Sequence, residues 1–151
     1  PAPTPTPTPA PTPAPAPAPK PPPRRAVAVA KPSPVKALLA DAGRLRNRGR
    51  TSEALDAYAR VLELEPVNAE ALAGRGLCYL EQSRYAPAKA SFEEALRGNA
   101  NDPDALMGLA ETYRYEGRRT DAVTYYRKYL AAHPQGRDAA AAQSAIEAFQ
   151  E

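Results

Sequence analysis

Residues 106–134 read LMGLAETYRYEGRRTDAVTYYRKYLAAHP, and their pattern recurs twice upstream at an interval of 34 residues. Shifting the sequence by this interval superposes leucines, small residues and bulky residues in one register. The matched sets are Leu38, Leu72 and Leu106; Ala42, Gly76 and Ala110; Leu45, Tyr79 and Tyr113; Ala54, Ala88 and Ala122; Tyr58, Phe92 and Tyr126; and Leu62, Leu96 and Leu130. A fixed period of about 20 to 50 residues indicates a repeat architecture.

Each repeat predicts two helices. Leu38, Ala42 and Leu45 are spaced i, i+4 and i+7, which places them on one face of a first helix. One face of a second helix carries the next set, which is Ala54, Tyr58, Val61 and Leu62. The small residue at 42, 76 and 110 lets the two helices approach closely. The bulky residue at 58, 92 and 126 then fills the space beside it.

Helix-ending and helix-opening residues separate these elements. Glycine tolerates the positive φ that ends many helices, and it stands at positions 49 and 117. Ser52 and Thr120 are the expected N-caps of two second helices, and Asp102 caps a first helix that begins with Pro103. Prolines at 66 and 134 close two second helices.

The pattern Leu106-x2-Leu109-Ala110-x2-Tyr113, followed by Gly117, Ala122, Tyr126 and Pro134, resembles the tetratricopeptide repeat family over residues 35–136. The resemblance implies an all-α, right-handed α-solenoid with repeats at 35–68, 69–102 and 103–136. Residues 137–151 would form a C-terminal capping helix, with Ile146 and Phe149 facing inward. Repeat 2 departs from the motif, because Ser83 and Ala100 replace the turn glycine and the closing proline.

Residues 1–34 predict a disordered linker rich in Pro, Ala and Thr. They hold fifteen of the nineteen prolines, no aromatic or acidic residue, and a net charge of +4, whereas residues 35–151 carry a net charge of −1. Alternating prolines favour extended polyproline II, which makes a semi-rigid spacer. The composition is similar to linkers of bacterial envelope proteins. A ligand for an SH3- or WW-like groove, and an autoinhibitory ligand for the chain's own groove, are the alternatives.

The sequence lacks the parts of an enzyme. His133 and Cys78 are the only residues of their kinds, so we expect no catalytic group, metal site or cofactor. No apolar run is long enough to span a membrane. We interpret a chain that begins at Pro1 without a leader as a piece of a longer, bacterial protein. The missing upstream sequence would decide between the cytoplasm and the periplasm or cell envelope.

The family resemblance also implies a concave groove lined by the first helices. The positions carried over are Leu39, Gly43, Arg46, Asn47, Ala73, Gly74, Leu77, Leu80, Met107, Gly108, Glu111, Arg114 and Tyr115. The cationic and amide residues of the subset that clamps carboxylates are replaced by Leu39, Gly43, Gly74, Asp104 and Gly108. We therefore expect an apolar or amphipathic peptide or helix of a protein partner in this groove. Alternatively, the groove side chains pack against one another.

Two other functions remain open at this stage. Self-association through the repeat ends or the last helix would make the chain a homo-oligomeric structural module. The run Arg44, Arg46, Arg48 and Arg50 could instead contact an anionic partner. Alternate residues of a helix point to different faces, however, and the high pI of about 9.1 arises from the tail. We therefore expect no nucleic-acid binding.

Overall fold

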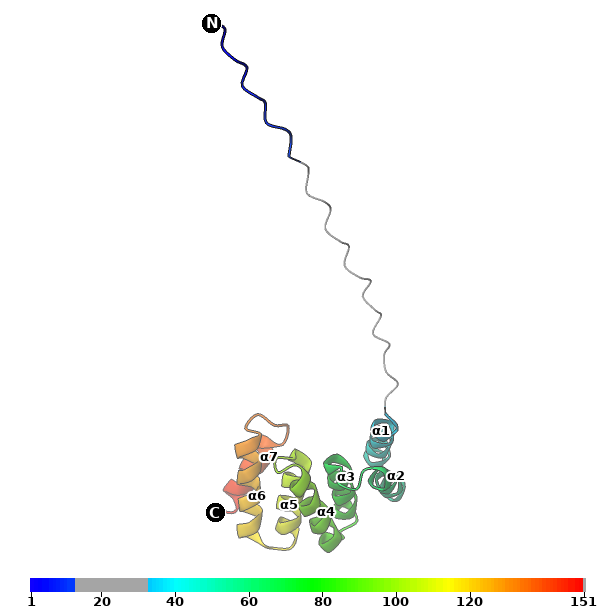
Figure 1. Ribbon diagram of the computed structural model, residues 1–151. Coiled ribbons are helices and arrows are strands. Elements are labelled where there is room, and N and C mark those ends of the chain that lie inside the picture. The colour runs from blue at the N-terminus through cyan, green and yellow to red at the C-terminus, as the bar shows by residue number, and fades with distance from the viewer. Residues whose placement is uncertain (13–32, 151) are drawn as a thin grey trace. The chain divides into compact units, whose positions relative to one another are not determined.

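The computed structural model describes residues 1–12 and 33–150 (Figure 1). Residues 1–12 are exposed and form neither helix nor strand. The predicted linker reaches to residue 34, so most of its prolines after Pro11 lie outside the described residues. The chain divides into two units, residues 1–30 and 31–151, and the helices all belong to the second.

Residues 33–150 contain seven helices and no strand. The helices are α1 (Pro34–Asn47), α2 (Thr51–Leu64), α3 (Ala69–Glu81), α4 (Tyr85–Gly98), α5 (Pro103–Tyr115), α6 (Arg119–Ala132) and α7 (Ala139–Ala148). Each helix packs against the next along the chain, and the first helices α1, α3 and α5 also contact one another in order. Figure 1 shows this stack from α1 to α7. The predicted all-α solenoid of three helix pairs and a last helix is confirmed.

The first helices α1, α3 and α5 each begin with a side-chain cap. Ser33, Asn68 and Asp102 accept hydrogen bonds from the backbone N–H three residues later, at 3.2, 2.9 and 2.9 Å. Pro34 and Pro103 occupy the first turn, where a missing N–H costs nothing. The predicted cap at Asp102 is therefore confirmed.

The second helices start differently from the prediction. Ser52 and Thr120 are not N-caps, because they already lie inside the helices. The N-caps of α2 and α6 are Arg50 and Arg118, whose side chains make no capping bond. These arginines instead bind acidic residues of the first helical turn, and Arg118 Nε donates to Asp121 at 2.7 Å.

The turn between first and second helices keeps one geometry in all three repeats. Gly49 and Gly117 have φ of +74° and +75°, as predicted, and Ser83 takes φ +58° at the corresponding position. In each turn, the N–H of the following arginine donates to a carbonyl five residues earlier, at 2.9, 2.8 and 2.8 Å. Repeat 2 therefore closes normally although a serine replaces the glycine.

An aromatic ring fills the space between neighbouring helices. Phe92 is fully buried, and a Cβ added to Gly76 of its own repeat would lie 2.6 Å from the ring. A Cβ added to Gly108 of the next repeat would lie 2.2 Å from the same ring. Tyr58 approaches Gly74 equally closely. Small residues are therefore needed on both sides of the ring. The sequence pattern predicted only the small residue of the same repeat, such as Gly76 beside Phe92.

The last helix covers the end of the stack. Ile146 is 6% exposed and belongs to the same apolar cluster as Leu106 and Tyr129, and Phe149 packs against that cluster from the C-cap of α7. Both side chains therefore face inward, as predicted. A second, smaller cluster joins α1 and α2 to α3 through residues that include Ala42, Val61 and Cys78.

Candidate peptide-binding groove

The thirteen positions carried over to the groove lie on α1, α3 and α5, with unequal exposure. The buried positions are Ala73, Gly74 and Gly108. The partly buried positions are Leu39, Gly43, Arg46, Leu77, Leu80, Met107 and Glu111. The exposed positions are Asn47, Arg114 and Tyr115. Gly74 and Gly108 lie against the rings of Tyr58 and Phe92, and these rings are themselves buried, so neither glycine is open to a ligand.

Three of these residues gather around one hollow of about 430 Å³. Leu80, Glu111 and Tyr115 line it together with Glu81, Ser83 and Tyr85. The hollow lies where α3 and α5 end and α4 begins. Sequence reasoning missed Tyr85, because only first helices were carried over from the family. A large aromatic residue directly after the turn was the signal that could have found it.

Tyr115 is the prominent side chain of this hollow. It is 56% exposed, yet it is held in place on both sides. The Arg114 guanidinium carbon lies 4.4 Å from the centre of its ring, and the Tyr85 ring stacks at 6.0 Å between centroids with an interplanar angle of 9°. A rigid, exposed aromatic ring loses little conformational entropy on binding, and Tyr and Arg are enriched among residues that dominate binding energy.

Glu111 organises the polar side of the hollow. It accepts a hydrogen bond from Arg114 Nε at 3.0 Å, and the buried Tyr126 hydroxyl donates to its other oxygen. Burial, reinforced by this carboxylate, raises the pKa of Tyr126, and the Glu111 hydrogen bond raises the pKa of Arg114. Glu111 is therefore neutralised within the chain, and it fixes Arg114 beside Tyr115.

The repeats match known proteins. The family model described as tetratricopeptide repeat matches residues 39–103 and 79–137. The chain belongs to the tetratricopeptide repeat family. Its repeats form a protein-interaction module, because stacked helix pairs of this family build extended concave binding surfaces.

Among curated relatives, a probable UDP-N-acetylglucosamine–peptide N-acetylglucosaminyltransferase SPINDLY of Hordeum vulgare is 34% identical over 93 residues, which are 62% of this chain and 10% of that protein. The chain thus spans about a tenth of the length of the SPINDLY relatives. The translocator chaperone SycD of Yersinia enterocolitica, in complex with a YopD peptide, superposes with a TM-score of 0.70 at 16% identity, covering 77% of this chain and 92% of that one.

A second solved structure is the first tetratricopeptide repeat domain of Spaghetti bound to an HSP90 peptide. It superposes with a TM-score of 0.70 at 17% identity, and the alignment covers 77% of this chain and 90% of that one. At such identities, the likeness to both solved structures concerns the fold alone.

The other reactive side chains of the repeats are held by local structure. Burial, with a smaller contribution from the Glu81 carboxylate, raises the pKa of the Cys78 thiol to about 11, so this thiol stays neutral at ordinary pH. His133 Nε2 lies 2.5 Å from the Asn101 carbonyl oxygen at the end of α6. Within residues 1–12 and 33–150, no three His, Cys, Asp or Glu side chains gather as a metal site.

The arginine run of repeat 1 does not form one patch. Arg44 bridges to Asp41 on the same helix, and Arg50 Nε donates to Glu53 at 2.6 Å. Arg46 is partly buried, and its Nε has no hydrogen-bond partner in the described residues. These three side chains therefore have different environments. In the same part of the chain, none of the helices is both long and apolar enough to cross a membrane.

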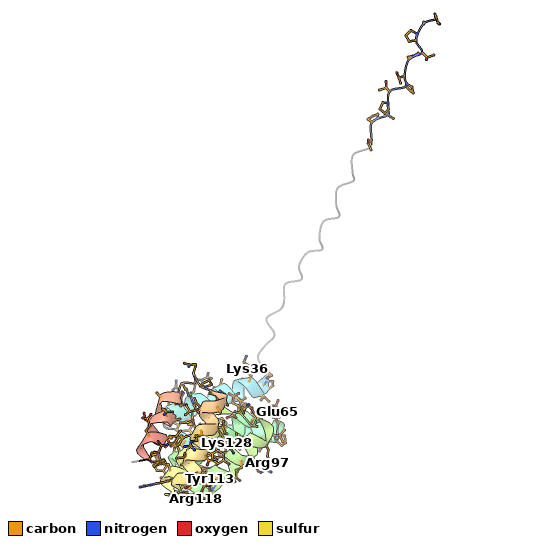
Figure 2. All side chains as sticks on the ribbon, turned by 90° about the vertical axis from the view of Figure 1, so that its left-hand side faces the viewer. Lys36, Glu65, Arg97, Tyr113, Arg118 and Lys128 are labelled. Carbon is orange, nitrogen blue, oxygen red and sulfur yellow. The ribbon has the colours of Figure 1, made fainter. Side chains whose placement is uncertain are left out.

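A cation–aromatic contact recurs beside two of the turns. The guanidinium carbon of Arg84 lies 4.7 Å from the ring centre of Tyr79. That of Arg118 lies 4.6 Å from the ring centre of Tyr113, and Figure 2 labels this second pair. These pairs are 34 residues apart and hold the turns against the first helices. In repeat 1 Leu45 replaces the tyrosine, so Arg50 has no ring to cover.

Proposed function

We propose that the repeats bind a peptide or helical segment of a protein partner in the concave groove, without catalysing a reaction. The groove consists of the exposed and partly buried positions of α1, α3 and α5. An apolar side chain of the ligand enters the hollow between Leu80 and Tyr115. The proline-rich residues 1–34 serve as a spacer that tethers the repeats to a larger bacterial envelope or signalling protein, a proposal that rests on composition.

One observation carries this proposal. Tyr115 is 56% exposed beside a hollow of about 430 Å³, and it is held by Arg114 and Tyr85. Partly buried Leu80 provides an apolar wall, so the hollow combines an exposed aromatic ring with an apolar surface beside it. Similar structures support the mode of binding, since the SycD and Spaghetti structures contain bound peptides.

The groove chemistry argues for a ligand unlike a carboxylate-terminated tail. The positions that would clamp a carboxylate carry Leu39, Gly43, Gly74, Asp104 and Gly108, none of which is cationic. Leu39, Leu77 and Met107 are partly buried along the same face. An amphipathic segment that presents apolar side chains at helical spacing fits this face better, and methionine adapts to ligands of varied shape.

The test is a peptide selection followed by variants. A displayed peptide library is selected on the full chain, and the dissociation constant of a selected peptide is measured by calorimetry. Tyr115→Ala should weaken binding about tenfold or more, because a hot-spot aromatic contributes roughly 2 kcal/mol. The control Leu64→Ala removes an exposed apolar side chain outside the groove and should leave the affinity unchanged. Equal affinity of wild type and Tyr115→Ala for the peptide would refute the proposed binding site beside Tyr115.

A further inference from the structure

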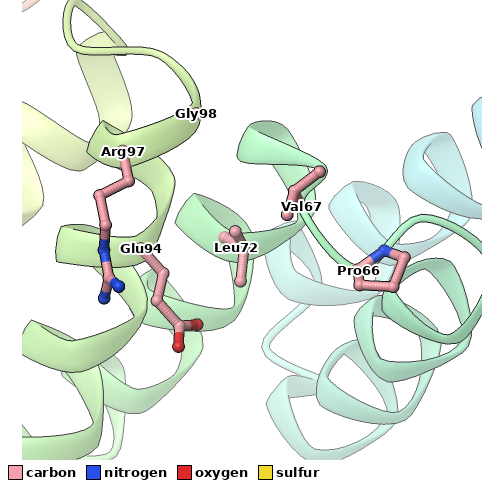
Figure 3. A pocket seen from close by; sticks show the side chains of 6 residues that line it. All are labelled: Pro66, Val67, Leu72, Glu94, Arg97 and Gly98. Atoms are coloured by element: carbon pink, nitrogen blue, oxygen red, sulfur yellow. The ribbon is translucent and has the colours of Figure 1, made fainter.

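A second hollow, of about 470 Å³, lies outside the concave groove. It is lined by Pro66, Val67, Leu72, Glu94, Arg97 and Gly98. Figure 3 shows Pro66 and Val67 on the loop between α2 and α3, Glu94 and Arg97 on α4 across from this loop, and Leu72 between the two sides. None of these residues contributes to the groove described above.

Exposed apolar side chains cluster at this hollow. In the described part of the chain, three large hydrophobic residues are exposed: Leu64 at 59%, Val67 at 79% and Tyr115 at 56%. Leu64, the last residue of α2, and Val67, in the following loop, are only three positions apart. Val67 lines the hollow itself. Leu64 and Val67 thus place two exposed apolar side chains at the edge of the hollow, where a partner could cover them.

The repeat itself provides an internal comparison. A hollow of about 490 Å³ recurs one repeat later and is lined by Ala100, Asn101, Leu106, Lys128, Ala131 and Ala132, which are the six corresponding residues displaced by 34. Asn101 stands where Val67 stands in the first hollow, and Ala100 stands in place of Pro66. The repeat fold therefore tolerates polar and small residues at these places, so folding does not require the exposed valine.

The two sides of the first hollow carry opposite charge. Glu63 and Glu65 are exposed beside Leu64 and Val67, and neither forms an ion pair with a described residue. Opposite them, Arg97 is exposed and likewise forms no ion pair within residues 33–150. Glu94 is already neutralised by Arg75 at 2.9 Å. One side is thus acidic and apolar, and the other side is cationic.

We propose that this hollow binds a second copy of the chain. In a two-fold symmetric pair, residues 63–67 of each copy lie in the hollow of the other, so that Val67 enters the cavity and Glu65 faces Arg97. A two-fold axis makes both contacts identical, and a surface with a projecting apolar residue beside a matching cavity complements itself. This orientation is favoured because it brings the acidic side of each copy against the cationic side of the other. An orientation that paired two identical sides would bring like charges together.

Sedimentation equilibrium of the full chain over a wide concentration range tests the proposal. Wild type should form a reversible dimer. Val67→Asp should weaken it about 100-fold or more, because the change removes two apolar contacts and buries two charges. Asn101→Asp is the matched control, since it places the same carboxylate at the corresponding position of the next repeat's hollow and should leave dimerisation unchanged. A wild type that stays monomeric, or equal weakening by both variants, would overturn the proposal.

The charges provide a sharper test. Glu65→Arg and Arg97→Glu should each prevent the dimer, because the first variant brings two cations together at each contact and the second brings two carboxylates together. An equimolar mixture of the two monomeric variants should dimerise, because both contacts of the mixed pair join unlike charges. The arginine introduced at position 65 of one variant faces the glutamate introduced at position 97 of the other, and the unchanged Arg97 and Glu65 face each other at the second contact. A mixture that stays monomeric would overturn the proposal. The surface lies outside the groove, so that outcome would leave peptide binding untouched.

Discussion

At the scale of single residues, the two glycines Gly108 and Gly43 should respond in opposite ways to the same methyl group. A Cβ on Gly108 would lie 2.2 Å from the Phe92 ring, which is fully buried and has no room to move, whereas a Cβ on Gly43 meets nothing within 4 Å. Gly108→Ala should therefore lower the free energy of unfolding by about 1–3 kcal/mol through overpacking. Gly43→Ala should raise it by roughly 0.5–1 kcal/mol through helix propensity. Urea denaturation measures both, and a stabilised Gly108→Ala would contradict the packing described here.

The same residues show what the sequence could and could not predict. The period of 34 predicted that Gly76 packs against Phe92, because both belong to one repeat. It did not predict that Gly74 and Gly108 lie under rings of the preceding repeat. Positions carried over from a family say which way a residue points, but they do not say which side chain of a neighbouring repeat it contacts. Tyr85 was missed for a similar reason, since its role depends on contact with Tyr115 across a helix pair.

At the scale of helices and turns, the sequence predicted which segments are helical more reliably than where they begin. Apolar periodicity identified every pair of helices, because burial of one face determines the helix. Ser52 and Thr120 were wrongly expected to cap α2 and α6, because cap propensity is weak beside the constraint of the turn. A left-handed residue at position 49, 83 or 117 fixes the chain direction, and the second helix follows after a single arginine.

Of the three turns, the one at Ser83 should be the easiest to stabilise by substitution. Ser83 holds φ +58°, a conformation that costs an L-residue roughly 1–2 kcal/mol. Ser83→Gly should therefore stabilise the chain by about 0.5–1 kcal/mol after the greater chain entropy of glycine is deducted. The reciprocal change Gly117→Ser, at φ +75°, should destabilise it by a similar amount. Thermal denaturation of both variants checks the pair, and a shift of the same sign in both would show that φ does not control these turns.

At the scale of the whole stack of repeats, stability should be graded from one end to the other. α1 has one fully buried residue, Ala42, and among the described residues no helix precedes it, whereas α5 has seven buried residues and packs between α4 and α6. In a linear array each helix is stabilised mainly by its neighbours, so local opening should be easiest at an end. Native-state hydrogen exchange should therefore find the amides of α1 exchanging faster than those of α4 and α5.

A substitution in the capping helix α7 tests whether the two ends of the stack open independently of each other. Ile146 anchors α7 to α6 and is 6% exposed, so Ile146→Ala should cost about 2–4 kcal/mol through the lost apolar contacts and the cavity. Because α7 contacts α6 and not the first repeat, exchange should accelerate in α7 and α6 and stay unchanged in α1. The small cluster around Ala42, Val61 and Cys78 is separate from the cluster that contains Ile146, which gives the physical reason for that independence. Equal acceleration in all seven helices would instead mean that the repeats unfold as a single cooperative unit.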